Sequence, residues 1–385
     1  MIAWFRYICL IVSLIITLPE LLSAQRLVSQ RQEDVEAGLL YNESVYILSN
    51  YSCLSSNSPE KLSLDELLRK QIEGFYFYLK RDTETNVLLL RKPDGTFTPF
   101  SESLEAIKTA LDADSTKVMT LFLDFYVEME LESSFKEIGL MEYVLEYDTK
   151  NGWPSLKDML SSGKRLVVFE VQKHLNSPSW LHNMRDFVEH TDADWGNQPE
   201  GVESFDERLK KNLSLFTGYK FLETSRGNSN DISALARQTP YLIESFKRAW
   251  IRDGRVPNFV LVDKYYAWLD VSLVTFRNFD IIYGAVTNNN ELLNYVNWDG
   301  MSNYTTGKYC FPLEPGAELM LSPISPGYRI EPATVYVSGT QRKAFAGDFK
   351  ARPLRIDEDI EIYLPFEGDE KDGSSNHNLT VSRNV

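Results

Sequence analysis

The 385-residue sequence is short of the residues on which several protein classes depend. Its three Cys are too few for a disulfide-based scaffold or a cysteine-rich zinc site. Its 40 Lys+Arg against 55 Asp+Glu give a net charge of −15, which argues against a generic nucleic-acid-binding protein and against docking on anionic lipid by charge alone. The motifs GxSxG, HExxH, GxGxxG and the P-loop are absent. Histidine is also scarce, with four residues.

The remaining composition is that of a folded chain. Hydrophobic residues make up 43% of the sequence and aromatic residues 12%, which is enough to build a core and excludes general disorder. A chain of this length holds one domain of barrel size or two ordinary domains.

The first 24 residues have the pattern of a secretory signal peptide. Arg6 precedes an apolar run at 7–18, and the small pair Ser23 and Ala24 follows Glu20. A membrane-spanning helix needs about 20 apolar residues, so a cleaved signal peptide is favoured over a signal anchor. We therefore predict a secreted protein, or one in the lumen of the secretory pathway, with no transmembrane segment in the mature chain.

Secretion agrees with five N-x-Ser/Thr sequons, which predict a glycoprotein. The acceptor residues are Asn42, Asn50, Asn212, Asn303 and Asn378. Once the signal peptide is removed, Cys53 and Cys310 remain. They could form one disulfide in an oxidising compartment or stay as two buried thiols.

Apolar strand-like runs alternate with amphipathic helical segments from residue 41 to 298. The runs include 45–49, 74–79, 87–90, 118–125, 165–171, 259–263 and 281–286. Helices are expected after Ser63, which forms a capping box with Glu66, after Ser101, from Trp153–Pro154, and over 180–189. About eight buried strands separated by helices predict an α/β fold of the (β/α)8 TIM-barrel type.

The composition and the hydrophobic pattern of the sequence change after residue 298. Prolines become frequent, and 334–337 and 360–364 alternate with the period of strands. The predicted organisation is a signal peptide (1–24), a polar leader (25–40), the barrel (41–298), a β-rich region (299–366) and a disordered acidic and polar tail (367–385).

Several segments, in order, carry a resemblance to one known family. They are 120–127 (TLFLDFYV), 153–160 (WPSLKDML), 164–169 (KRLVVF), 213–221 (LSLFTGYKF) and 255–265 (RVPNFVLVDKY). This set resembles the X domain of phosphatidylinositol-specific phospholipase C (PI-PLC), most closely the secreted, plant-type branch. The resemblance implies a phospholipase-C-like phosphodiesterase barrel over about residues 42–290, and phosphoric diester hydrolysis as the activity of the family.

The family chemistry requires two imidazoles for proton transfer, a cation for the phosphate and an orienting carboxylate. By the resemblance, Asn50 replaces the first His, although a shift of one residue would put Tyr51 there. Glu73 replaces an Arg on the second strand and would repel a phosphate there. Tyr78 replaces an Asp on the same strand, and Arg91 stands near the second His. These positions are degenerate, because none of them keeps the residue that the family's catalysis uses. We therefore assign no catalytic residue.

Other residues could still line a pocket. Asp124 and Asp263 fall on acidic family positions, Tyr265 follows the second, and His174 lies just after a strand. Each could equally be a polar contact at the barrel mouth. Asp192 and Asp194 form a DxD pair that lacks the other ligands of a calcium loop, so we predict no metal and no cofactor.

Three functions stay open. The favoured one is a secreted pseudoenzyme that binds an inositol phospholipid or phosphodiester through a PI-PLC X-like barrel. The alternative is an active phosphodiesterase with a relocated site around Arg91, Asp124, His174 and Asp263, which requires these side chains to converge. The third is a structural or carbohydrate-binding glycoprotein. By the resemblance, Asn50 stands where the family has a catalytic His, so a glycan on Asn50 would lie at the mouth of the barrel and block substrate access. No nucleic acid is expected as a partner.

Overall fold

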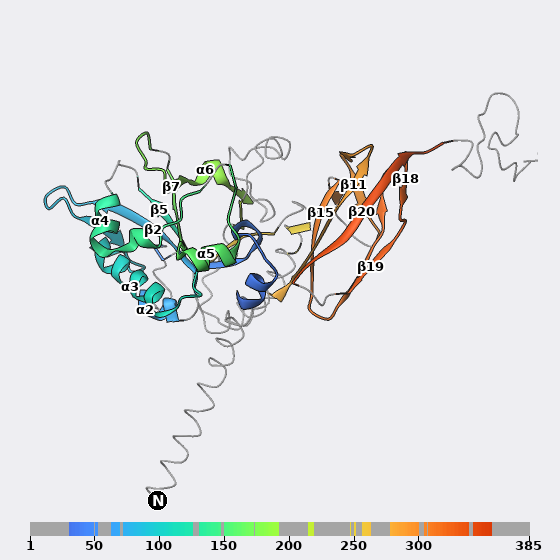
Figure 1. Ribbon diagram of the computed structural model, residues 1–385. Helices are drawn as coiled ribbons and strands as arrows, with labels where there is room; N and C mark the ends of the chain where they lie inside the picture. The colour runs from blue at the N-terminus through green and yellow to red at the C-terminus, as the bar shows by residue number, and fades with distance from the viewer. Residues whose placement is uncertain are drawn as a thin grey trace, which may run out of the picture. The chain divides into compact units, whose positions relative to one another are not determined.

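The computed structural model describes two compact units (Figure 1). The residues described are 31–49, 51–52, 63–69, 72–125, 131–147, 150–172, 174–191, 215–218, 247, 250–251, 256–262, 278–299, 304–305, 307–338 and 342–355. Unit 1 comprises Met1–Ala249 and Val256–Phe279, and unit 2 comprises Trp250–Arg255 and Asp280–Val385. The predicted signal peptide and acidic tail lie outside the described residues.

A curved parallel sheet forms the frame of unit 1. Its strand order is β7-β6-β5-β2-β1-β10-β9-β8, and every ladder along this path is parallel. The strands are β1 (Tyr46–Ser49), β2 (Gly74–Arg81), β5 (Met119–Asp124), β6 (Leu166–Glu170), β7 (Leu181–Asn183), β8 (Val188–Thr191), β9 (Leu215–Gly218) and β10 (Phe259–Val262). No ladder joins the end strands β7 and β8 within the described residues. The α/β class is confirmed, and closure into a complete barrel stays a prediction.

One face of this sheet, which we call the inner face, carries Tyr46, Tyr76, Phe122, Phe169 and Phe259 in register. The Phe122 ring centroid lies 5.1 Å from that of Phe169 and 5.2 Å from that of Phe259. Strands β5 and β10 are separated by β2 and β1 in the sheet, so these rings meet only because the sheet curls. The inner face therefore encloses an aromatic core.

The helix that begins at Phe100 packs on the opposite, outer face against Phe77, and local sequence explains where several helices begin. Ser63 and Glu66 form the predicted capping box before α2, with the Glu66 amide donating to Ser63 Oγ at 3.3 Å and the Ser63 amide to Glu66 Oε2 at 2.7 Å. Ser155 caps α5, and its Oγ accepts from the Asp158 amide at 3.1 Å. The helices are α2 (Leu64–Arg69), α3 (Phe100–Ala113), α4 (Leu131–Ile138), α5 (Leu156–Ser162) and α6 (Met184–Phe187), with 3-10 turns η1 (Tyr41–Glu43) and η2 (Leu140–Glu142).

Three local predictions in unit 1 are wrong. The helix predicted after a Ser101 cap begins two residues earlier, at Phe100, because buried Phe100 packs against Phe77 and Pro99 takes the cap position. The helix predicted from Trp153–Pro154 begins only after the Ser155 cap, at Leu156. The segment 180–189 is not one helix but contains β7, α6 and β8, because its residues pair with β6 and β9.

The hairpin strands β3 (Leu88–Arg91) and β4 (Phe97–Pro99) extend β2 on the same sheet. Both ladders are antiparallel, with Leu79 opposite Leu90 and Arg91 opposite Phe97. The apolar run at 87–90 is therefore a strand, as expected, but it lies off the parallel path. This arrangement returns Arg91 to the carboxyl end of β2.

Unit 2 is a β-structure with a core of its own. The strands are β11 (Asp280–Asn288), β12 (Glu291–Leu292), β13 (Val296–Trp298), β14 (Tyr304–Thr305), β15 (Lys308–Leu313), β16 (Glu318–Leu321), β17 (Pro323–Ile324), β18 (Tyr328–Glu331), β19 (Val335–Ser338) and β20 (Lys343–Pro353). The main sheet has the order β12-β11-β20-β18, with β15 beside β11. Trp298 packs against Tyr309, Phe311 and Phe349 of this sheet.

Strand β11 also corrects the sequence analysis, which assigned 281–286 to the barrel. Its inward side chains Ile282 and Val286 join the core of unit 2. Gly284 allows a close approach there, because a Cβ would lie 2.3 Å from the carbonyl oxygen of Gly347. The unit boundary thus falls before Asp280, whereas the predicted barrel ended at residue 298. The described helices include none that is both long and apolar enough to cross a membrane.

Candidate functional site

Polar side chains meet on the inner face at the carboxyl ends of β2 and β5. The Tyr76 hydroxyl donates to Asp124 Oδ2 at 2.8 Å. Tyr78 lies directly opposite Asp124 in the parallel ladder, so its side chain leaves the same face. Active sites of TIM-like barrels lie at the carboxyl ends of the strands. We therefore take this edge as the candidate site.

Arg91 joins this edge from the antiparallel hairpin. Its guanidinium carbon lies 5.7 Å from the centroid of the Tyr78 ring. Tyr78 and Arg91 follow the last pair of the ladder, Leu79 with Leu90, and Ser52 Oγ bridges the Tyr78 amide and the Arg91 carbonyl. The structure thus unites three residues singled out in the sequence, Arg91, Tyr78 and Asp124, in one row across β3, β2 and β5.

The Asp124 carboxylate has an unused acceptor. The residue is only 9% exposed, and Oδ1 is buried without a hydrogen-bond partner. A buried acceptor left unpaired costs free energy, so a donor group that reaches it gains more than one bound in open water. Oδ1 is the best-defined point at which this edge could hold a hydroxyl or another donor of a ligand.

The loop after β1 supplies packing and hydrogen bonds here. The ring of Tyr51 contacts Phe75 and Phe77, which alternate with Tyr76 and so lie on the outer face. Burial, with smaller contributions from nearby carboxylates, raises the pKa of the Tyr51 hydroxyl, which therefore stays protonated and is not a general base. Ser52 Oγ accepts from the Tyr78 amide at 2.8 Å and donates to the Arg91 carbonyl at 2.9 Å, which fixes the hairpin against the loop.

His174 belongs to a second polar cluster, which is built around Glu170. The Glu170 side chain is buried, and its Oε2 lies 3.0 Å from His174 Nδ1 and 2.5 Å from Ser177 Oγ. Asn183 Nδ2 donates to Oε1 at 3.3 Å. The imidazole stacks on the Phe125 ring with centroids 4.4 Å apart. A carboxylate that orients a partly buried imidazole is a common catalytic arrangement. Here the same carboxylate also contacts Ser177 and Asn183, so the pair could equally be structural.

The two clusters lie on opposite faces of the sheet. The register pairs Tyr78 with Asp124, whereas Glu170 pairs with Leu123. Because successive side chains of a strand point to opposite faces, Glu170 leaves the outer face and Asp124 the inner face. Phe125, the neighbour of Asp124, contacts His174 on the outer face. The register therefore separates Glu170 from Asp124, and the convergence of His174 with Arg91 and Asp124 stays a prediction.

His182 lies in the aromatic core. It is 4% exposed on β7, and its ring contacts Trp153, Phe169 and Phe187. Its Nε2 lies 3.2 Å from the Leu145 carbonyl oxygen, which can only accept, so Nε2 carries the hydrogen. Burial lowers the pKa of His182, which keeps it neutral and structural.

The lowered pKa of His182 predicts a pH dependence of stability. Between this pKa and the unfolded value of about 6.5, the unfolded chain binds more protons, so stability rises with pH. We expect the free energy of unfolding to fall as the pH drops below about 6.5 and to fall less in His182→Gln. Urea unfolding at several pH values measures both slopes. Equal slopes in the two proteins would contradict the core assignment.

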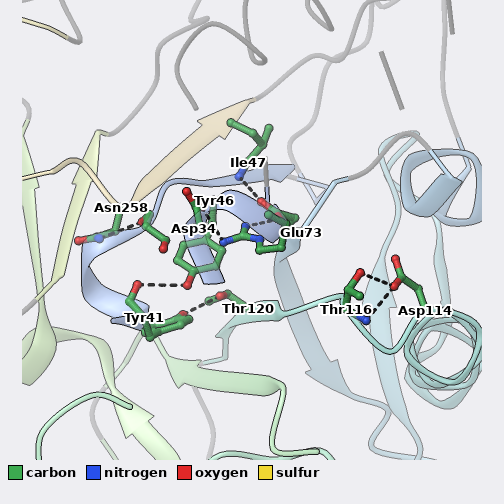
Figure 2. Close-up of polar contacts among 11 residues, drawn as sticks. Asp34, Tyr41, Tyr46, Ile47, Glu73, Asp114, Thr116, Thr120 and Asn258 are labelled. Carbon is green, nitrogen blue, oxygen red and sulfur yellow. Dashed lines mark hydrogen bonds and ion pairs between the residues drawn. The ribbon is translucent and has the colours of Figure 1, made fainter. Parts of the chain in front are cut away.

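Glu73 lies at the other end of β2, five positions before Tyr78 and about 17 Å away along an extended strand. It is 6% exposed and forms an ion pair with buried Arg31, which also contacts Asp34 at 3.4 Å. Figure 2 shows Glu73 beside Tyr46 and Ile47, whose amide donates to Glu73 Oε2 at 3.3 Å. The interpretation that Glu73 would repel a phosphate at the mouth is wrong, because the carboxylate is paired at the opposite end of the strand.

Other residues at the amino-terminal end of the strands also stabilise the fold. The Tyr41 hydroxyl and Thr120 Oγ1 are 2.7 Å apart, and Asn258 Nδ2 donates to the Ser44 carbonyl at 3.0 Å (Figure 2). These bonds join the segment before β1 to β5 and β10. In TIM-like barrels this end of the sheet contributes to stability.

Several predicted positions lie outside the described residues. They are Asn50, Cys53, Asp192, Asp194, Asn212, Asp263, Tyr265, Asn303 and Asn378. Asn42 is half-buried on η1. Cys310 is buried, and the Trp250 indole donates to its Sγ at 3.1 Å. The disulfide and all five glycans stay predictions. Within the described part of the chain, no group of three His, Cys, Asp or Glu is arranged to hold a metal ion.

Sequence reasoning missed Tyr76, Glu170 and Arg31. Glu170 ends an apolar strand four residues before His174, a spacing that could have indicated the pair. Tyr76 alternates with Tyr78 on β2, so the inner-face position of either one predicts the other. Arg31 gave no signal, since it is distant from Glu73 in the sequence.

Comparison with known families supports the resemblance over part of the chain. Residues 90–199 match the family model described as PI-PLC X 1. This segment is PI-PLC X-like, and it includes Arg91, Asp124 and His174. The match begins after β2, so it excludes positions 50, 73 and 78. The plant-type branch stays a prediction, and no curated protein matches the sequence.

Solved structures similar to this chain include bacterial enzymes. A mutant phosphatidylinositol-specific phospholipase C from Staphylococcus aureus is 12% identical, with a TM-score of 0.40 over 65% of this chain and 96% of the other. The enzyme from Listeria monocytogenes is 11% identical, with a TM-score of 0.40 over 62% of this chain and 95% of the other.

Proposed function

We propose that this chain is a secreted glycoprotein whose PI-PLC X-like unit binds an inositol phospholipid or a related phosphodiester without cleaving it. The observation that carries the proposal is the makeup of the inner-face edge. It presents Tyr76, Tyr78, Arg91 and Asp124, while His174 and His182, the imidazoles whose surroundings are described, lie elsewhere. General acid and general base catalysis each contribute about 10²- to 10⁴-fold, so an edge whose described residues include a carboxylate but no imidazole favours binding over turnover.

The same residues suggest how a ligand would be held. Arg91 brings a fixed positive charge for a phosphate, and its planar donors suit two oxygens at once. Asp124 Oδ1 is a buried acceptor for a hydroxyl of a polyol ring. The tyrosine rings offer apolar contact beside these charges.

A second function has one observation in its favour. The His174–Glu170 pair could act as a carboxylate-oriented base in a phosphodiesterase with a relocated site. Glu170 leaves the face opposite to Asp124, so a site centred on this pair would require other groups to bind the phosphate. We rank this activity below binding.

The first test compares turnover with binding. We expect no measurable hydrolysis of phosphatidylinositol or inositol 1,2-cyclic phosphate, with or without calcium. Calorimetry with soluble inositol 1,2-cyclic phosphate is expected to detect binding that falls roughly 10- to 100-fold in Asp124→Asn, since hydrogen bonds to charged groups contribute about 1.5–3 kcal/mol. Glu105→Gln, an exposed carboxylate on α3, is the matched control and should bind like the parent protein.

Two results would overturn this assignment. Hydrolysis that disappears in His174→Ala would establish the relocated enzyme instead. Binding that is equal in Asp124→Asn and Glu105→Gln would remove the inner-face site. The proposed glycan at Asn50 has its own test, because peptide mapping of secreted protein that finds Asn50 unmodified would exclude a glycan-blocked mouth.

A further inference from the structure

The main sheet of unit 2 has one face on the side opposite to its core, which we call the basic–aromatic face. It is covered at one end, where Ile281 and Cys310 are buried and the Trp250 indole donates to Cys310 Sγ. Register defines it: Tyr283 lies opposite Phe345, Ala285 opposite Asp348, and Thr287 opposite Lys350. The Lys350 ammonium lies 3.2 Å from Thr287 Oγ1, which places both side chains on this face. The alternate residues, such as Val286 and Phe349, are buried in the core.

Large apolar side chains are exposed on this face. The rings of Tyr283 and Phe345 are neighbours with centroids 5.6 Å apart, and they are 37% and 57% exposed. The Lys343 ammonium lies 5.2 Å from the Tyr283 ring centroid. Leu292 of β12 is opposite Thr287 and 50% exposed. Grouped exposed apolar side chains beside cations mark a surface that meets something less polar than water.

The charge of this face is opposite to that of the chain. Among the described residues its cations are Lys308, Lys343, Lys350, Arg329 and Arg352, and its carboxylates are Asp348 and Glu331. The whole chain carries −15. Exposed charges are screened beyond about 8 Å at physiological ionic strength, so a docking surface responds to the local excess of cations.

We propose that the basic–aromatic face of unit 2 docks on an anionic phospholipid surface. The cations attract the headgroups, and each Lys or Arg close to such a surface strengthens binding about fivefold. Phe345, Tyr283 and Leu292 then enter the boundary between headgroups and acyl chains, where aromatic side chains are favoured. This function belongs to unit 2 and does not depend on the inner-face edge of unit 1.

The apolar side chains favour lipid over other anionic partners. An acidic polysaccharide would use the cations, but it would gain little from the exposed aliphatic side chain of Leu292. A lipid interface uses both kinds of group. The face therefore predicts two separable contributions, one sensitive to salt and one sensitive to loss of an exposed apolar side chain.

Vesicle sedimentation with the full chain tests the proposal. We expect binding to phosphatidylcholine vesicles containing 30% phosphatidylserine, weak binding to phosphatidylcholine alone, and a decline with salt. Lys308→Gln/Lys350→Gln should weaken binding about 25-fold, as two cations are removed. Phe345→Ser should weaken it at high salt as well as at low salt.

The controls separate this face from the rest of the molecule. Lys136→Gln/Lys157→Gln changes the net charge equally in unit 1, and Tyr336→Ser removes a 75% exposed ring from β19, outside the main sheet. Both should bind like the parent protein, as should Asp124→Asn. Absence of binding to the anionic vesicles, or equal losses in test and control variants, would overturn the proposal. Retention on a sulfated polysaccharide without vesicle binding would assign the face to a different partner.

Discussion

Replacing Glu73 by Ala is expected to lower the free energy of unfolding by about 3–5 kcal/mol, because the substitution leaves the Arg31 guanidinium buried without its main carboxylate. Arg31 and Glu73 are each 6% exposed, so solvent cannot take the place of the missing partner. The Ile47 amide loses an acceptor in the same substitution. Urea unfolding of the full-length variant measures the loss.

A double-mutant cycle distinguishes the ion pair from general packing. Arg31→Met/Glu73→Leu replaces both charges by apolar groups of similar size, and such replacements are often neutral. We expect the double variant to be more stable than Glu73→Leu alone. The cycle formed by Arg31→Met, Glu73→Leu and the double variant should give a coupling energy of about 0.5–3 kcal/mol. Additive single losses would contradict the proposed pairing. Because Arg31 also contacts Asp34, Arg31→Met should cost at least as much as Glu73→Gln.

Phe122→Ala is expected to destabilise unit 1 by about 3–5 kcal/mol, the usual cost of removing a buried phenyl ring from a close-packed core. The Phe122 ring is 2% exposed and contacts Phe169 and Phe259. It therefore joins β5 to β6 and, across the curled sheet, to β10. Unfolding in urea and amide hydrogen exchange in β5 measure the effect.

Phe97→Ala is the matched control, because Phe97 on β4 is 36% exposed and lies under the Lys80 ammonium at 3.7 Å. Loss of an exposed cation–π contact costs about 0.5–1 kcal/mol. A Phe122→Ala loss no larger than that of Phe97→Ala would show that the inner face is not packed as described.

The sequence predicted the buried strands and the Ser63 cap well, because these depend on neighbours in the chain, whereas the predicted Ser101 cap was wrong. The run 118–125 could only be a buried strand, and Ser63 with Glu66 could only begin a helix. The prediction of one helix over 180–189 is wrong because the spacing of its apolar residues fits both a helix and a strand. The pairing of Leu181 with Val168 decides in favour of a strand. The assignment of 281–286 to the barrel is wrong because a strand buried in the core of unit 2 resembles one buried in a barrel.

The candidate site was predictable in its residue types but not in its geometry. Arg91, Tyr78 and Asp124 were named as separate degenerate or acidic positions, and only the ladders bring them into one row. Glu73 was misplaced because a family position gives no information about Arg31, which pairs with it from outside the aligned segments.

The alternation between Asp124 and Phe125 sets a rule for redesign of this protein. An engineer who wished to install hydrolysis would have to place new imidazoles on the inner face, at positions such as 76 or 78, where the strand already directs side chains toward Arg91 and Asp124. Strengthening His174 would not serve, since its ring is on the outer face against Phe125. Because successive residues of a strand point to opposite faces, a shift of one position decides whether an imidazole reaches Arg91 and Asp124 or packs against the framework.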